Sequence, residues 1–151
     1  MIETPRVLIV EARFYSHIAD ALLDGATAAL EKAAALFERI AVPGALEVPP
    51  TIAFAAKAGE SAGRSFDGFV ALGCVIRGGT HHFEIVAGES ARGLMELSIR
   101  HGLCIGNGIL AVENEDQAMA HAARDGQDRG GDAARACLAL IDARARLAAR
   151  R

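Results

Sequence analysis

The chain has few of the residues that would indicate a disulfide-stabilised, membrane-spanning or nucleic-acid-binding protein. It contains three cysteines, one tyrosine, no tryptophan and only two lysines, and its formal net charge is −3. The cysteines (Cys74, Cys104 and Cys137) form no CxxC pair, and their odd number favours free thiols in a reducing cytoplasm. A weakly negative chain has no electrostatic attraction to nucleic acid or to an anionic membrane, so neither is an expected partner.

Long apolar runs are also absent. No stretch approaches the roughly 18 consecutive apolar residues that a membrane helix needs. The first apolar run, residues 7–10, ends at Glu11 and does not resemble a signal peptide. Hydrophobic residues nevertheless make up 52% of the 151 residues, so they must be buried inside the fold or between subunits. We expect a single domain, residues 1–151, that needs no disulfide or metal to fold.

Short apolar segments bounded by turn residues predict four β-strands. Their near-continuous apolar character is typical of parallel strands that are covered on both faces. The predicted strands lie at residues 7–12, 36–42, 68–76 and 103–112.

Segments with helical spacing separate the strands. The first predicted helix is expected to be capped by Ser16, and the helix that contains residues 87–98 is expected to gather its core-facing residues on one face. The alternation predicts an α/β fold with a four-stranded parallel sheet between two helix layers. The predicted helices are one that follows Ser16, one at 48–57, one with Ala87, Ala91, Leu94, Met95 and Ser98 on its buried face, a short one at 116–124, and one from 132 to the end.

Ligands of an open parallel sheet bind beyond the carboxyl ends of its strands. Residues 12–15, 42–47, 74–83 and 113–114 follow the predicted strands and are expected to meet at this edge. The richest segment is 77–82. Its backbone amides at Gly78, Gly79 and Thr80 precede a helix and favour an anion, Arg77 adds positive charge, and a histidine titrating near neutral pH suits proton transfer. A plain turn with solvated histidines is the alternative, but so many suitable groups in six residues favour the anion site.

Two other residues at this edge have both a structural and a functional interpretation. Phe14 either covers the adjacent helix or stacks on a flat heterocycle. Glu47 either interacts with a helix dipole or accepts hydrogen bonds from a polyol.

Several familiar kinds of site are not expected. The glycines at 106 and 108 fit G-x-G-x-x-A, but they interrupt an apolar run, so they predict a strand with a close backbone neighbour rather than a dinucleotide site. His81, His82 and Glu84 match no zinc spacing, so no metal is expected. The two lysines, Lys32 and Lys57, are predicted in mid-helix, which argues against a Schiff base on the enzyme.

Several blocks of the chain resemble the lumazine synthase family over essentially its whole length. The blocks cover residues 11–14, 42–47, 72–83, 107–110 and 113–118, followed by the glycine pair at 130–131. The resemblance implies a flavodoxin-like α/β/α sandwich. It also implies the condensation of 5-amino-6-ribitylaminouracil with 3,4-dihydroxy-2-butanone 4-phosphate, the penultimate step of riboflavin biosynthesis. This reaction needs no cofactor and no nucleophile from the enzyme, only proximity and proton transfer.

The resemblance also implies roles for individual residues. Position by position, His82 matches the general acid or base, and a second group matches residues that hold the pyrimidine and its ribityl chain. Gly79 and Thr80 match the phosphate-binding pair. Asn107 and Leu46 stand where many members carry phenylalanine. The second group contains Phe14, Ala45, Leu46, Glu47, Cys74, Val75, Ile76 and Asn107.

The family resemblance further implies a homo-oligomer whose active sites are shared between adjacent subunits. Arg129 matches a basic phosphate ligand from the neighbouring subunit, and His121, or Arg124 one turn later, takes the place of a second. We expect a free pentamer rather than a shell of pentamers, and riboflavin synthase is a further expected partner. Two alternatives remain open: a paralogue that binds flavin without catalysis, and an unrelated flavodoxin-like protein.

Overall fold

The computed structural model describes residues 4–150. Strands and helices alternate along it as predicted. The elements are β1 (Arg6–Ala12), α1 (Ser16–Lys32), β2 (Leu36–Val42), the 3₁₀ helix η1 (Ala45–Glu47), α2 (Val48–Ala62), β3 (Gly68–Ile76), α3 (His82–His101), β4 (Ile105–Val112), α4 (Glu115–Ala122) and α5 (Arg129–Ala149).

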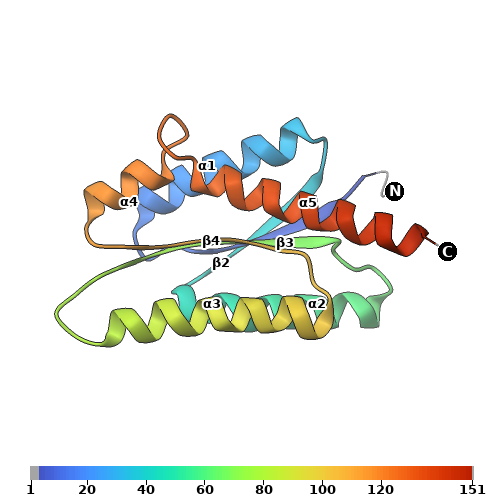
Figure 1. Cartoon of the computed structure of the whole chain (residues 1–151), viewed down its shortest axis with the longest axis horizontal. Coiled ribbons are helices and arrows are strands. Elements are labelled where there is room, and N and C mark those ends of the chain that lie inside the picture. The colour runs from blue at the N-terminus through green and yellow to red at the C-terminus, as the bar shows by residue number, and fades with distance from the viewer. Residues whose placement is uncertain (1–3, 151) are drawn as a thin grey trace.

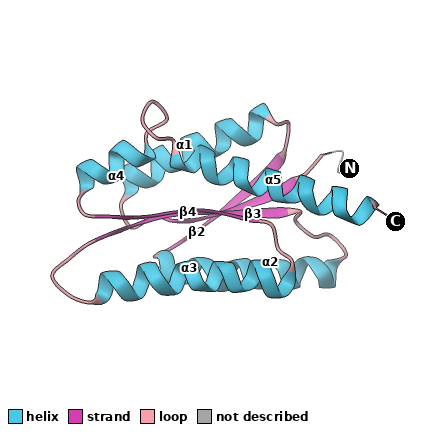
Figure 2. Ribbon diagram, in the orientation of Figure 1, coloured by secondary structure: helices cyan, strands magenta, loops and turns pink. Residues whose placement is uncertain are grey.

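The four strands form one parallel sheet in the order β2-β1-β3-β4. Helices α2 and α3 lie along one face of the sheet, and α1, α4 and α5 lie along the other (Figure 1). The three layers, helices outside and strands between, are seen edge-on in Figure 2. This strand order is that of the flavodoxin-like fold without its fifth strand, so the predicted α/β/α sandwich is confirmed.

The core consists of two apolar layers, one on each face of the sheet. Ile9 and Leu22 belong to the layer under α1 and α5, whereas Val10 and Ile52 belong to the layer under α2 and α3. Consecutive strand residues point to opposite faces, so a strand covered on both sides must be apolar at nearly every position. The apolar runs of β1 and β3 have this cause, whereas β2 lies at the edge of the sheet and most of its residues are exposed.

Local chemistry fixes where several helices begin and end. The Asn114 side chain accepts a hydrogen bond from the Gln117 amide at the start of α4, and Asp128 does the same for Gly131 at the start of α5. α2 and α3 end at Gly63 and Gly102, which adopt the left-handed conformation that favours glycine.

The structure corrects some sequence-based expectations. Ser16 is the first residue of α1, and no side-chain hydrogen bond caps that helix. On α3 the buried face is formed by Val86, Ser90 and Leu94, while Ala91 and Met95 are exposed. The predicted face was about one residue out of phase, because alanines and a methionine gave it no clear apolar centre.

The glycine pair in β4 lies within the strand, as expected. A Cβ at Gly106 would lie 1.8 Å from the carbonyl oxygen of Ala133 in α5, so the helix backbone lies directly over the strand. The glycines are required by this close approach and do not turn a strand into a nucleotide-binding helix. Among residues 4–150, no helix is both long and apolar enough to cross a membrane.

Candidate active site

A cavity of about 380 Å³ lies at the carboxyl edge of the sheet. Its walls come from the ends of β1, β2 and β3 and from the start of α3, which is where a parallel sheet places its ligand. The lining residues are Phe14, Tyr15, Gly44, Ala45, Leu46, Glu47, Cys74, Val75, Ile76, His82 and Val86. The convergence that the sequence predicted at residues 12–15, 42–47 and 74–83 is therefore present.

The aromatic wall of the cavity is a pair of rings. Phe14 is 75% exposed, and its ring centroid lies 4.9 Å from that of Tyr15 in an edge-to-face contact. Tyr15 is half-buried and packs against the core, so it supports Phe14 from below. A large apolar ring left open to solvent at a cavity is well placed to stack on a flat ligand.

Two ionisable side chains of the lining, Cys74 and Tyr15, have raised pKa values. Burial raises the pKa of the Cys74 thiol to about 11, with a further contribution from the charge of Glu115. Burial, and then the proximity of Cys74 and Glu115, also raises the pKa of Tyr15. Both groups are neutral at physiological pH, so this part of the cavity suits an uncharged ring.

Glu47 closes a turn and also lines the cavity. Its Oε1 accepts a hydrogen bond of 2.9 Å from the Gly44 amide and so closes the turn between β2 and α2. The residue also lines the cavity. A carboxylate has more acceptor sites than one amide occupies, so it can still accept hydrogen bonds from the hydroxyls of a ligand.

His82 is the first residue of α3 and lines the cavity. Its backbone amide donates to the hydroxyl of Thr80 over 3.3 Å. Gly79 and Thr80 themselves are exposed and are not part of the lining, and a Cβ at Gly79 would touch nothing within 4 Å among the described residues. The loop that was expected to bind phosphate thus lies open beside the cavity.

Arg77 is engaged elsewhere. Its Nε donates to both carboxylate oxygens of Glu113 at 3.0 and 3.1 Å, and its Nη1 donates to Glu84 at 2.5 Å. The guanidinium also stacks over the ring of Phe83, 4.4 Å from the centroid. Hydrogen bonds to Glu113 and Glu84 raise the pKa of Arg77. Two carboxylates neutralise this charge, so Arg77 braces the loop and is not the free anion ligand that the sequence suggested.

Other residues that were predicted to bind ligand lie away from this cavity. Asn107 is exposed in the middle of β4, where its Oδ1 accepts a hydrogen bond of 2.9 Å from the Ile109 amide. His121 lies in the last turn of α4, and Arg129 begins α5 with its Nε 3.1 Å from the side-chain oxygen of Gln127. Arg124 lies 3.6 Å from a carboxylate oxygen of Asp24. Within one chain, no lysine or arginine lines the cavity.

Sequence reasoning assigned no role to three of the lining residues: Tyr15, Gly44 and Val86. Tyr15 adjoins Phe14, and Val86 lies one helical turn after His82, so both could have been found from their neighbours. Among residues 4–150 no three His, Cys, Asp or Glu side chains are grouped so as to hold a metal ion.

The chain is similar in sequence to proteins of one enzyme family. A family model described as 6,7-dimethyl-8-ribityllumazine synthase matches residues 4–145. The chain is 55% identical over 148 residues to 6,7-dimethyl-8-ribityllumazine synthase 1 of Rhizobium meliloti, covering 98% of this chain and 97% of the relative. It is 55% identical to the Agrobacterium fabrum synthase (95% and 97% covered) and 58% identical to that of Bartonella tribocorum (93% and 91% covered).

Proposed function

The chain belongs to the 6,7-dimethyl-8-ribityllumazine synthase family, and from that membership we propose that the cavity beside Phe14 and His82 is the site of the family's reaction. The chain is a transferase of riboflavin biosynthesis. It condenses 5-amino-6-(D-ribitylamino)uracil with 3,4-dihydroxy-2-butanone 4-phosphate, and the product is 6,7-dimethyl-8-ribityllumazine. One observation carries the assignment of the site: the rings, the carboxylate and the imidazole that this reaction requires line a single cavity.

The pyrimidine stacks on Phe14 in this proposal. Backbone groups of Cys74, Val75 and Ile76 read its polar edge, and Ala45, Leu46 and Glu47 hold the ribityl chain. The neutral side chains of Cys74 and Tyr15 support this placement, because no charge is then buried against the uncharged heterocycle.

The chemistry of this proposal is proton transfer between positioned reactants. The amine of the pyrimidine itself attacks the ketone, so the enzyme supplies no nucleophile. Lys32 and Lys57, the only lysines, lie in α1 and α2 and not in the cavity lining. His82 moves the protons as imine formation, loss of phosphate and ring closure proceed. Holding the two substrates together supplies most of the remaining acceleration.

The phosphate is bound, in the same proposal, between two subunits. Gly79 and Thr80 offer backbone and hydroxyl donors, but the cavity of one chain has no cationic lining residue. Arg129, with His121 or Arg124, supplies the positive charge from an adjacent copy, and Asn107 reaches the ligand in the same way. The protein is then a homo-oligomer, a free pentamer in our proposal, and a monomer is inactive.

The cellular setting follows from the same assignment. All three cysteines are free thiols, which suits a cytoplasmic enzyme. Its product is the substrate of the enzyme that completes riboflavin, so riboflavin synthase is a proposed partner. Residues 1–151 act as one domain in this proposal.

A steady-state assay with both substrates tests the proposed function. We expect the lumazine product from the parent protein. We expect His82→Ala to slow turnover by at least about tenfold while the KM of each substrate changes little, because proton transfer contributes to the transition state and not to ground-state binding. Flavin affinity without any product would instead favour the non-catalytic paralogue. Unchanged turnover in the His82 variant would remove His82 from its role.

A further inference from the structure

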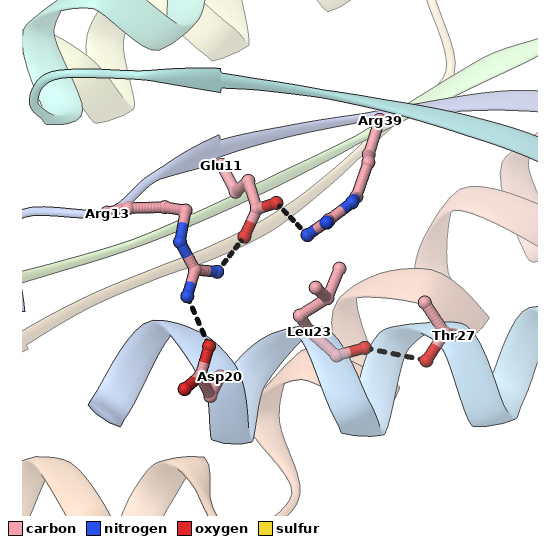
Figure 3. Close-up of polar contacts among 6 residues, drawn as sticks. All are labelled: Glu11, Arg13, Asp20, Leu23, Thr27 and Arg39. Atoms are coloured by element: carbon pink, nitrogen blue, oxygen red, sulfur yellow. Dashed lines mark hydrogen bonds and ion pairs between the residues drawn. The ribbon is translucent and has the colours of Figure 1, made fainter. Parts of the chain in front are cut away.

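An ionic cluster with one buried carboxylate at its centre lies beside the aromatic wall and outside the cavity. Glu11, in β1, is only 1% exposed, and its two carboxylate oxygens accept hydrogen bonds from two arginines (Figure 3). Arg13 Nη1 donates to Oε1 at 2.6 Å, and Arg39 Nη1, from β2, donates to Oε2 at 2.9 Å. The second terminal nitrogen of Arg13 donates to Asp20 in α1. We call these four residues the Arg13 cluster.

The burial of Glu11 gives the cluster its rigidity. A buried carboxylate is tolerated only when it is paired, and removing one partner of such a pair is strongly destabilising. Arg13 is therefore held in place by Glu11 on the sheet and by Asp20 on the helix. The hydrogen bonds to Asp20 and then to Glu11 raise the pKa of Arg13, so its charge is permanent.

The backbone of Arg13 extends the connection to the cavity. Its amide donates to the carbonyl oxygen of Val42, the last residue of β2, over 3.3 Å. Residue 44 and η1, which follow Val42, form one wall of the cavity. Phe14 and Tyr15, which follow Arg13, form another. The Arg13 side chain thus holds its own turn to Glu11 and Asp20, while its main-chain amide links the same turn to the end of β2.

We infer that Arg13 is a positioning residue: it touches no substrate, but it fixes the turn that presents Phe14 to the pyrimidine. The inference rests on the proposed function of the cavity. Phe14 needs such support because its side chain is 75% exposed beside the Tyr15 ring. A ring on a loose turn must be ordered again by each ligand that stacks on it, and that ordering weakens binding.

The Arg13→Ala variant tests the inference through the two KM values. We expect the KM for the ribitylaminopyrimidine to rise about tenfold, while kcat stays within about threefold and the KM for the keto-phosphate within about twofold. The effect is selective because the side chain that alanine removes holds the turn that presents Phe14, whereas the main-chain bond from residue 13 to Val42 remains. A role in stability alone would change the amount of folded protein and leave both KM values unaltered.

Arg39→Ala is the matched control. Arg39 also bonds a single oxygen of Glu11, so its loss leaves the same buried carboxylate half paired. Its side chain extends from β2, however, and among the hydrogen bonds of residues 4–150 it reaches Glu11 and not the turn that carries Phe14. We expect a similar loss of stability and an unchanged pyrimidine KM. A rise equal to that of Arg13→Ala would overturn the inference.

Two milder variants keep the test decisive if Arg13→Ala does not fold. Asp20 is 71% exposed, so Asp20→Asn weakens the helix side of the cluster without leaving a buried charge unpaired, and we expect a rise of about threefold in pyrimidine KM. Arg13→Lys keeps the charge but cannot bond Glu11 and Asp20 together. We expect its pyrimidine KM to lie above that of the parent and no higher than that of Asp20→Asn. Parental KM values in both variants would overturn the inference alone, whereas absence of product from the parent protein would overturn the proposed function with it.

Discussion

Gly106 has no space for a side chain, and we expect Gly106→Ala to lower the melting temperature by about 10 °C. An ideal Cβ there would lie 1.8 Å from the carbonyl oxygen and 2.7 Å from the carbonyl carbon of Ala133. Both atoms belong to the backbone of α5, so no change of rotamer relieves the contact. The helix would have to move away from the sheet by roughly 1 Å in a close-packed interior.

The size of the effect follows from what α5 covers. Its buried face includes Ala133, Ala134, Cys137 and Ile141, all of which would lose contact with the sheet. Overpacking of this kind costs about 3 kcal/mol where backbone must move. For a domain of this size each kcal/mol lowers the melting temperature by about 3 °C, which gives the expected shift.

Circular dichroism melts at matched protein concentration measure this shift, because association between copies raises the apparent stability. Gly88→Ala is the control. Gly88 is exposed in α3, and apart from its chain neighbours and the backbone of its own helix no heavy atom of residues 4–150 lies within 4 Å of its Cβ position, so alanine should stabilise that helix by up to about 1 kcal/mol. A Gly106→Ala protein that melts within about 2 °C of the parent would refute the close approach of α5 to β4.

Two further predictions concern the site. Arg129→Ala should raise the KM for the keto-phosphate about tenfold and leave the pyrimidine KM unaltered, because a charge-assisted bond to phosphate is lost. Steady-state kinetics measure both KM values. An unaltered keto-phosphate KM would show that Arg129 does not bind the phosphate. Burial raises the pKa of Cys74 from 9.0 to about 11. At pH 8 its thiolate fraction is therefore about 100-fold below that of an ordinary thiol. Alkylation of Cys74 by iodoacetamide, followed by mass spectrometry, should be correspondingly slow and should accelerate as the pH rises toward 11. Alkylation at pH 8 as fast as that of an ordinary thiol would contradict this expectation.

The sequence predicts the strands better than the helix ends. The bounds 36–42 and 68–76 agree with β2 and β3, because turn residues flank both segments, although only β3 is apolar throughout and β2 contains Glu38 and Arg39. α2 continues to Ala62, beyond the predicted end at residue 57, because its last turn consists of small and polar side chains without a periodic apolar face. α5 begins at Arg129 instead of 132, since Asp128 caps it from an unusual left-handed conformation.

Some residues of the site could likewise be predicted from the sequence, and others could not. Residues that follow a strand directly, such as Phe14, Glu47 and Ile76, could be assigned to one edge from topology alone. The Arg13 cluster could not, because Glu11 and Arg39 are 28 residues apart and nothing in either segment indicates that the carboxylate is buried. In the proposed function His121 and Arg129 meet the ligand from a second subunit, and neither strand order nor spacing within one chain predicts that geometry.

The hydrogen bond from the Gly44 amide to Glu47 affects how substitutions at residue 47 are to be read. Alanine there removes a turn closure and a ligand acceptor together, so a weakened enzyme would not reveal which loss was responsible. Glutamine separates them: its amide oxygen can still accept from the backbone, while the group left for the polyol becomes a donor. In the proposed function the Glu47 side chain both closes the turn and accepts hydrogen bonds from the ribityl chain, and only an isosteric exchange separates the two contributions.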